Sequence, residues 1–381
     1  METLNRPVNT NGAKSIEDFE QIRKDYDHKE SFLKQVFREK APDYTEIEIS
    51  FFQLCHMHCS FCWQDTYDPG GTQNIVEKAQ TVVNYLIQKK SSLKKEIQVH
   101  LLGGELFEDR NDYYSDYFEF IQSVQDHAQK FLEGHNLKFV FLTNMNFQED
   151  STLNKLETFL TRLESINTKV VLTTSWDPTG RPLKGETSTK FHHNINYFKK
   201  YVSEITFVLT RPTIKKLLSG NTPYLDLLIN EGFTVEYDYY MPTNLVDKLM
   251  PSDRDLLNAF RVLIKKYPSI PKLKQWADPE WDRTIPTRLT CASLNKITIL
   301  PDGTITNCRH LSYSPDEFET EIKNESNSDM MMNFISKKEC LSCEFFQECP
   351  LSCFLMSDHK KYNGSSSLDE CLYKTLFRER N

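Results

Sequence analysis

The stretch Cys55-His56-Met57-His58-Cys59-Ser60-Phe61-Cys62 closely follows an apolar, β-leaning run at 47–52. Three thiolates at the spacing C-x3-C-x2-C can each bind one iron of a cubane [4Fe-4S] cluster, which leaves the fourth iron open to a small molecule. A structural zinc site, which prefers four closed ligands, is the alternative, with His56 or His58 as the fourth. The sequence therefore predicts a metal centre just after a strand.

The other seven cysteines also cluster, all of them between Cys291 and Cys371. Their pattern is C-x11-G-x4-C, then C-x2-C-x5-C-x3-C, then a last cysteine. Buried structural thiols would be scattered, whereas clustered thiols at short fixed spacing are typical of metal sites. The turn 301–304 predicts a hairpin of two short strands, at 296–300 and 304–306. Two zinc sites are again the alternative, although seven thiolates do not fill two four-cysteine sites.

Composition indicates a globular, water-soluble protein of two domains, or of one large barrel with an appendage. The chain has 381 residues, of which 39% are hydrophobic and 26% charged. We find no long uncharged apolar run and no signal-peptide pattern at the N-terminus, so we expect a cytoplasmic protein that does not enter a membrane. The net charge of -8 argues against a general nucleic-acid binder.

Strand-like and helix-like runs alternate between residues 46 and 245, which predicts an α/β fold with a parallel sheet. The expected strands are 46–52, 96–102, 137–143, 169–175, 204–209 and 233–239, and helical patterns include 74–90, 113–132, 151–165 and 221–231. Six such units fit a partial barrel, in which the chemistry gathers at the carboxyl ends of the strands. Helical spacing also occurs at 15–38, and a further helix is expected to begin near Ser252.

Polar and glycine residues stand at three of these strand ends. Gly103-Gly104-Glu105 follows the second strand, Thr143-Asn144 the third and Thr174-Ser175-Trp176-Asp177 the fourth. Paired glycines permit a close backbone approach, and the carboxylate after them can accept a hydrogen bond from an ammonium group. Each of these short motifs taken alone is also compatible with an ordinary turn.

Together, the cysteine loop and the Gly-Gly-Glu motif resemble the radical S-adenosylmethionine (SAM) family. This resemblance implies that SAM chelates the open iron and is cleaved to a 5′-deoxyadenosyl radical. It also implies that Glu105 holds the SAM amino group, that Ser175 contacts the ribose and that Asp177 shapes the pocket. The expected SAM-binding set is Gly103, Gly104, Glu105, Thr143, Asn144, Ser175 and Asp177.

The C-terminal cysteines resemble the SPASM motif, C-x9–15-G-x4-C…C-x2-C-x5-C-x3-C…C, at all seven cysteines and the glycine. This resemblance implies two auxiliary clusters, and so three [4Fe-4S] clusters in all. The distal cluster would be held by Cys340, Cys343, Cys349 and Cys371, and the proximal cluster by Cys291, Cys308 and Cys353.

The chain departs from the sulfatase-maturating group in two places. That group has an additional cysteine where this chain reads Thr284-Ile285-Pro286-Thr287, and an aspartate base where this chain has Arg309. One proximal iron therefore lacks a cysteine. A substrate donor, a water, a backbone group or a carboxylate such as Asp282 would complete it. The second departure argues against formylglycine generation.

The sequence is therefore interpreted as a partial (β/α)6 radical SAM barrel with a C-terminal SPASM iron-sulfur domain. The expected parts are an N-terminal helical segment (1–45), the radical SAM core (46–245), a bridging region (246–290) and the SPASM domain (291–381). The expected activity is oxidation or crosslinking of side chains in a ribosomal peptide, with flavodoxin or ferredoxin as the electron donor. A dehydrogenase or epimerase acting on a sugar or aminoglycoside is one alternative, and a non-catalytic iron-sulfur electron carrier is another. The sequence identifies no catalytic acid or base.

Overall fold

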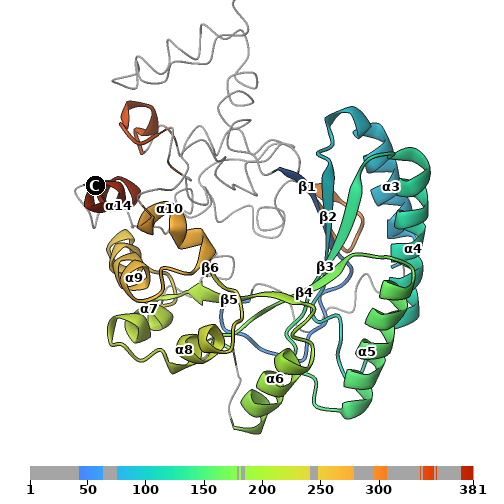
Figure 1. Ribbon diagram of the computed structural model, residues 1–381, viewed down its shortest axis with the longest axis horizontal. Coiled ribbons are helices and arrows are strands. Elements are labelled where there is room, and N and C mark those ends of the chain that lie inside the picture. Colours follow the sequence, from blue (N-terminus) through green and yellow to red (C-terminus); the bar gives the residue numbers. More distant parts are fainter. Residues whose placement is uncertain are drawn as a thin grey trace, which may run out of the picture.

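The computed structural model describes residues 43–62, 75–177, 180–181, 185–240, 248–278, 296–306, 335, 338–346, 349 and 370–380. The described strands form one sheet in the order β6-β5-β4-β3-β2-β1-β7-β8 (Figure 1). Its strands are β1 (Tyr44–Ser50), β2 (Glu96–Leu102), β3 (Asn136–Leu142), β4 (Val170–Ser175), β5 (Val202–Leu209), β6 (Val235–Tyr239), β7 (Lys296–Ile299) and β8 (Ile305–Thr306). Strands β1 to β6 are parallel and neighbour one another in chain order. The predicted partial barrel is therefore confirmed.

Helices connect the strands and line the outer side of the curved sheet (Figure 1). They are α3 (Lys78–Gln88), α4 (Tyr114–Phe131), α5 (Asp150–Ser165), α6 (Glu186–Tyr197), α7 (Arg211–Leu218), α8 (Pro223–Asn230), α9 (Asp253–Lys266), α10 (Lys274–Ala277) and α14 (Leu372–Arg380), with 3-10 turns η3 (Lys90–Ser92), η4 (Pro271–Leu273) and η6 (Cys340–Ser342). The expected start near Ser252 is confirmed by a capping box, in which Ser252 and Asp255 bond each other's backbone N–H. Among the described helices, none has the length and apolar character needed to cross a bilayer.

Apolar and polar side chains alternate along the strands, which explains why helices cover one face of the sheet. In β2, Ile97, Val99 and Leu101 are fully buried in the core that the helices complete. The intervening Gln98 and His100 lie on the opposite, polar face, where His100 Nε2 is 3.2 Å from Gln98 Oε1. Successive strand side chains point to opposite faces, so one strand supplies both the core and the polar interior of the barrel.

The predicted hairpin at 296–306 is also confirmed, with Gly303 at φ +86° in its turn. Its first strand, β7, joins the barrel sheet parallel to β1, a placement that the sequence did not predict. Lys296 Nζ lies 2.8 Å from Glu46 Oε1 and 3.0 Å from Glu48 Oε1, and all three side chains are about nine-tenths buried or more. Thr298 Oγ1 donates to Glu48 Oε2 at 2.8 Å. A buried ion triad thus fixes the register between β1 and β7.

The C-terminal helix α14 packs on the other side of the barrel through aromatic rings. Trp276 is 2% exposed, stacks on Tyr373 at 5.3 Å between centroids, and lies 4.8 Å from Phe377. The Tyr373 hydroxyl donates to the hydroxyl of Tyr239 in β6 at 2.8 Å. The N-terminal segment 1–42 and the bridging residues 279–290 lie outside the described residues.

We expect Lys296→Met to lower the free energy of unfolding by about 3 to 5 kcal/mol, because it leaves two buried carboxylates without their cation. Urea unfolding of the metal-free chain, followed by circular dichroism, measures this loss. Lys155→Met is the matched control, because its partner Asp112 is 67% exposed and such surface pairs contribute under about 1 kcal/mol. Equal losses in the two variants would contradict the role of the triad.

Candidate functional site

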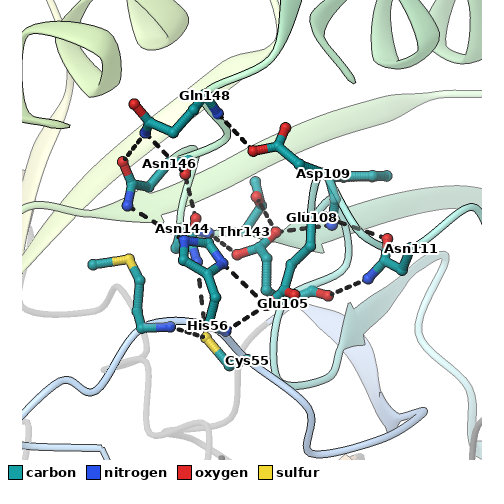
Figure 2. Close-up of polar contacts among 12 residues, drawn as sticks. Cys55, His56, Glu105, Glu108, Asp109, Asn111, Thr143, Asn144, Asn146 and Gln148 are labelled. Atoms are coloured by element: carbon teal, nitrogen blue, oxygen red, sulfur yellow. Dashed lines mark hydrogen bonds and ion pairs between the residues drawn. The ribbon is translucent and has the colours of Figure 1, made fainter. Parts of the chain in front are cut away.

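The buried carboxylate of Glu105 joins the loops that follow β1, β2 and β3 (Figure 2). Its Oε1 accepts hydrogen bonds from Phe107 N at 2.9 Å and from Thr143 Oγ1 at 2.6 Å, and its Oε2 accepts one from Asn144 N. Its own backbone N–H donates to Leu54 O at 2.8 Å, just before the first cysteine. Burial raises the pKa of Glu105, although these hydrogen bonds act in the opposite direction. Three hydrogen-bond donors therefore compensate for the loss of hydration of the Glu105 carboxylate, which is only 1% exposed.

Gly104 lets this loop approach the cysteine loop. A Cβ atom at this position would lie 1.7 Å from Leu54 O and 2.5 Å from Gln53 O, which are backbone atoms. Only a residue without a side chain fits against another backbone at this distance. The paired-glycine motif is thus explained by the close approach of the two loops.

The three loop cysteines are partly buried. Cys62 N donates to Cys59 O at 3.0 Å, which closes a tight turn between the second and third cysteines. The Cys55 sulfur accepts from Met57 N at 3.4 Å and from Asn144 Nδ2 at 3.8 Å. Burial and the nearby charge of Glu105 raise the pKa of Cys55 to about 12. A thiolate here is therefore costly without a cation, and metal coordination, which deprotonates thiols outright, supplies that cation.

His56, one of the two histidines considered as a zinc ligand, is engaged by neighbouring side chains (Figure 2). Its Nδ1 lies 3.1 Å from Glu108 Oε1, its backbone N donates to the same oxygen at 2.5 Å, and its Nε2 lies 3.4 Å from Asn146 Nδ2. Burial opposes its charge, yet the hydrogen bond and the charge of Glu108 raise the pKa of His56. Both ring nitrogens thus have partners, which favours a positioning role for His56 over a metal-binding one.

The donor set of the loop is compatible with a cubane cluster. Within the described ranges, no three His, Cys, Asp or Glu side chains converge on one metal position. The thiolates of a [4Fe-4S] cluster each bind a different iron, so they need not converge on one point. The three partly buried thiols of Cys55, Cys59 and Cys62, at the carboxyl end of β1, are the residues that would hold the cluster.

The loop after β4 packs on the cysteine loop from the other side. Asp177 is fully buried, and its carboxylate accepts hydrogen bonds from Gly180 N at 3.1 Å and from Thr213 Oγ1 at 3.2 Å. Ser60 N in turn donates to Gly180 O at 2.8 Å. Asp177 thus fixes the position of Gly180 against the cysteine loop. Ser175, the expected ribose contact, is half-buried at the end of β4.

Arg181 is a residue of this site that sequence reasoning missed. It is 6% exposed, its Nη2 donates to Asn144 O at 3.2 Å, and the same nitrogen lies 3.9 Å from Met57 Sδ. Burial raises the pKa of Cys59, while the charge and a hydrogen bond of Arg181 lower it. The signal in the sequence was an arginine four residues after the strand-end Asp177.

The four cysteines expected to hold the distal cluster are all described, and they lie near one another. Burial raises the pKa of Cys340 well above its ordinary value, and the charges of Cys349, Cys371 and Cys343 add to the effect. Cys343 N donates to Cys340 O at 3.0 Å, and Cys371 directly precedes α14. The proximal-cluster residues Cys291, Cys308 and Cys353 lie outside the described residues, as do Asp282 and Arg309.

Comparison with known proteins identifies the fold. No protein-family model and no curated protein matches the chain. The structure is similar to native anSMEcpe with bound AdoMet, with a TM-score of 0.58 and 15% identity over 88% of this chain and 95% of that one. It is also similar to a hexahistidine-tagged form of anSMEcpe with bound AdoMet, with a TM-score of 0.56 and 15% identity over 88% and 91% of the chains. Streptococcus suis SuiB bound to the precursor peptide SuiA gives a TM-score of 0.48 and 16% identity over 93% and 81%. The first two likenesses show that the chain shares the fold of anSMEcpe.

We expect Gly104→Ala to displace the cysteine loop, because its new methyl group would overlap Leu54 O. Overpacking of this kind costs about 1 to 3 kcal/mol, so the thermal midpoint should fall and a thiol reagent should modify Cys55 faster than in the parent protein. Gly134→Asn is the control, because a Cβ at Gly134 meets nothing within 4 Å and asparagine tolerates its positive φ. Unchanged reactivity of Cys55 in Gly104→Ala would contradict the assigned contact.

Proposed function

We propose that this protein is a radical SAM enzyme whose Cys55, Cys59 and Cys62 hold a [4Fe-4S] cluster. The observation that carries the proposal is the contact of the cysteine loop with Gly104, Glu105 and Asn144 at the strand ends. This arrangement occurs in a fold shared with a protein whose structure contains AdoMet. With SAM and one electron from a donor, a cluster held there would supply a 5′-deoxyadenosyl radical able to take a hydrogen atom from a substrate carbon.

The contribution of this chain is to position the cofactors and keep them in place. Glu105 Oε1 already accepts two hydrogen bonds and Oε2 one, so Oε2 retains an acceptor position for an ammonium group. Ser175 offers a hydroxyl at the end of β4, and Asp177 holds the loop beside the cysteines. Because buried hydrogen bonds fix these loops, little reorganisation is needed when SAM arrives.

The proposed substrate is a ribosomal peptide whose side chains are oxidised or crosslinked. The support comes from the SPASM-like cysteine spacing and from the proximity of Cys340, Cys343, Cys349 and Cys371. The distal cysteines would hold an auxiliary cluster, which would provide an acceptor for the electron lost when the substrate radical is oxidised. Flavodoxin or ferredoxin is the proposed donor to the first cluster. A small-molecule dehydrogenase or epimerase is the second candidate, because the same cysteine loop and distal cysteines would serve the oxidation of a sugar or aminoglycoside equally well.

We expect anaerobically reconstituted protein to contain about twelve iron and twelve sulfide per monomer, to bind SAM in a calorimetric titration, and to release 5′-deoxyadenosine under reduction. Cys59→Ala should abolish deoxyadenosine release, because it removes one ligand of the first cluster. Cys343→Ala is the matched control: it should lose iron from the distal cysteines yet still cleave SAM. If calorimetry detects no heat of SAM binding to the fully loaded parent protein, the electron-carrier alternative is favoured instead.

We expect a peptide encoded beside the gene to change in mass when it is incubated with the loaded protein, SAM and dithionite. A loss of about two mass units per modified site, measured by mass spectrometry, corresponds to a two-electron oxidation in which an X–H bond and a C–H bond are replaced by one new bond. The Cys59→Ala protein should leave the peptide unchanged. If deoxyadenosine forms while the peptide mass stays constant, the peptide assignment is wrong, and sugars or aminoglycosides become the next substrates to test.

A further inference from the structure

The Arg181 guanidinium is buried and only partly paired within the protein. Its Nη2 reaches Asn144 O, whereas Nε and Nη1 have no hydrogen-bond partner among the described residues. A buried cation needs a partner of opposite charge, since leaving it unpaired costs several kcal/mol. The guanidinium lies beside the cysteine loop, because its Nη2 is 3.9 Å from the sulfur of Met57, which stands between Cys55 and Cys59. A cluster held by that loop, whose cysteines bind as thiolates, would supply the missing anion.

A second side-chain donor faces a cysteine of the same loop. Asn144 Nδ2 lies 3.8 Å from the Cys55 sulfur, and the carbonyl oxygen of the same asparagine accepts from Arg181. Arg181 and Asn144 thus form one connected group whose N–H donors face the cysteine loop, at the sulfurs of Met57 and Cys55. A planar guanidinium can contact the Asn144 carbonyl and the loop at once, which an ammonium group does less well.

Hydrogen bonds and charges beside cluster sulfurs tune the reduction potential of an iron-sulfur cluster. Reduction adds one negative charge to the cluster, and a fixed cation nearby stabilises the reduced form more than the oxidised form. A buried cation acts strongly, because the surrounding protein screens it less than water would.

We propose that Arg181 is a positioning residue whose buried charge, placed beside the cysteine loop, raises the reduction potential of the cluster that this loop would hold. This inference rests on the proposed function, because it requires that the loop holds a cluster. It assigns to Arg181 a role in the reduction of the loop cluster, and this reduction comes before the reaction with substrate. The neighbouring Asn144 keeps the guanidinium in place through its carbonyl oxygen.

The test is a potentiometric titration of the anaerobically reconstituted full chain without SAM, followed by electron paramagnetic resonance. The signal of the loop cluster is the one that disappears in a Cys55→Ala, Cys59→Ala, Cys62→Ala variant. We expect Arg181→Met to shift the ratio of oxidised to reduced loop cluster at least tenfold toward the oxidised form, a change of about 59 mV in the midpoint. Arg181→Lys, which retains the charge, should shift it by less than about threefold.

Arg162→Met is the matched control, because it removes the same charge from α5, where Arg162 lies over the Phe118 ring at 3.5 Å. Its midpoint should equal that of the parent protein. If Arg181→Met does not give folded protein by circular dichroism, Arg181→Gln replaces it, with the same expected direction, because it keeps a donor for Asn144 O without the charge.

An unchanged midpoint in the Arg181 variant would overturn the inference, and a loss of SAM affinity at that unchanged midpoint would instead make Arg181 a SAM ligand. A parent protein without any loop-cluster signal would contradict the proposed function itself, so the two failures are distinguishable.

Discussion

The site depends on one buried carboxylate. Glu105 is 1% exposed and receives three hydrogen bonds, from Phe107 in its own loop and from Thr143 and Asn144 after β3. An ionised carboxylate in this position would be strongly destabilising without those donors. Because these donors come from the loops after β2 and β3, the need to satisfy the carboxylate holds the two loops together. Because the Glu105 backbone also bonds Leu54 O, the start of the cysteine loop is fixed along with them.

The C-terminal part of the chain is attached to both ends of this sheet. Near β1, the ion triad of Lys296 with Glu46 and Glu48 attaches β7. Near β6, Trp276 packs against α14, which begins immediately after Cys371. Two independent contacts, one electrostatic at β7 and one aromatic at α14, therefore connect C-terminal segments of the described chain to the barrel. The second of them lies directly beside Cys371.

The sequence predicted the elements of the barrel well, because its signals are local. Strand β2 occupies the expected residues 96–102, and β1 begins two residues before its expected start at 46. The glycine pair at 103–104 was recognised as a close-approach motif, and the structure identifies Leu54 O as the atom approached. Alternating apolar and polar residues, turn residues and helix caps all act within a few residues of one another, so they can be identified before any fold is known.

Contacts between distant segments could not be predicted in the same way. Neither Glu108, which holds His56, nor Arg181 stood in a motif that single-sequence reasoning recognises, and the attachment of β7 to β1 depends on side chains some 250 residues apart in sequence.

The charges around the cysteine loop explain why these unforeseen residues matter. The carboxylates of Glu105 and Glu108 act on the Cys55 thiol and that of Asp177 acts on the Cys59 thiol, each raising its pKa. An anionic pocket of this kind would attract a metal cation, but it would also oppose the arrival of an electron. The buried guanidinium of Arg181 is a cationic group beside that pocket, and Glu108 raises the pKa of His56 against the effect of burial. The proposed cluster site would need both kinds of charge, and here they come from different strand ends that only the folded barrel brings together.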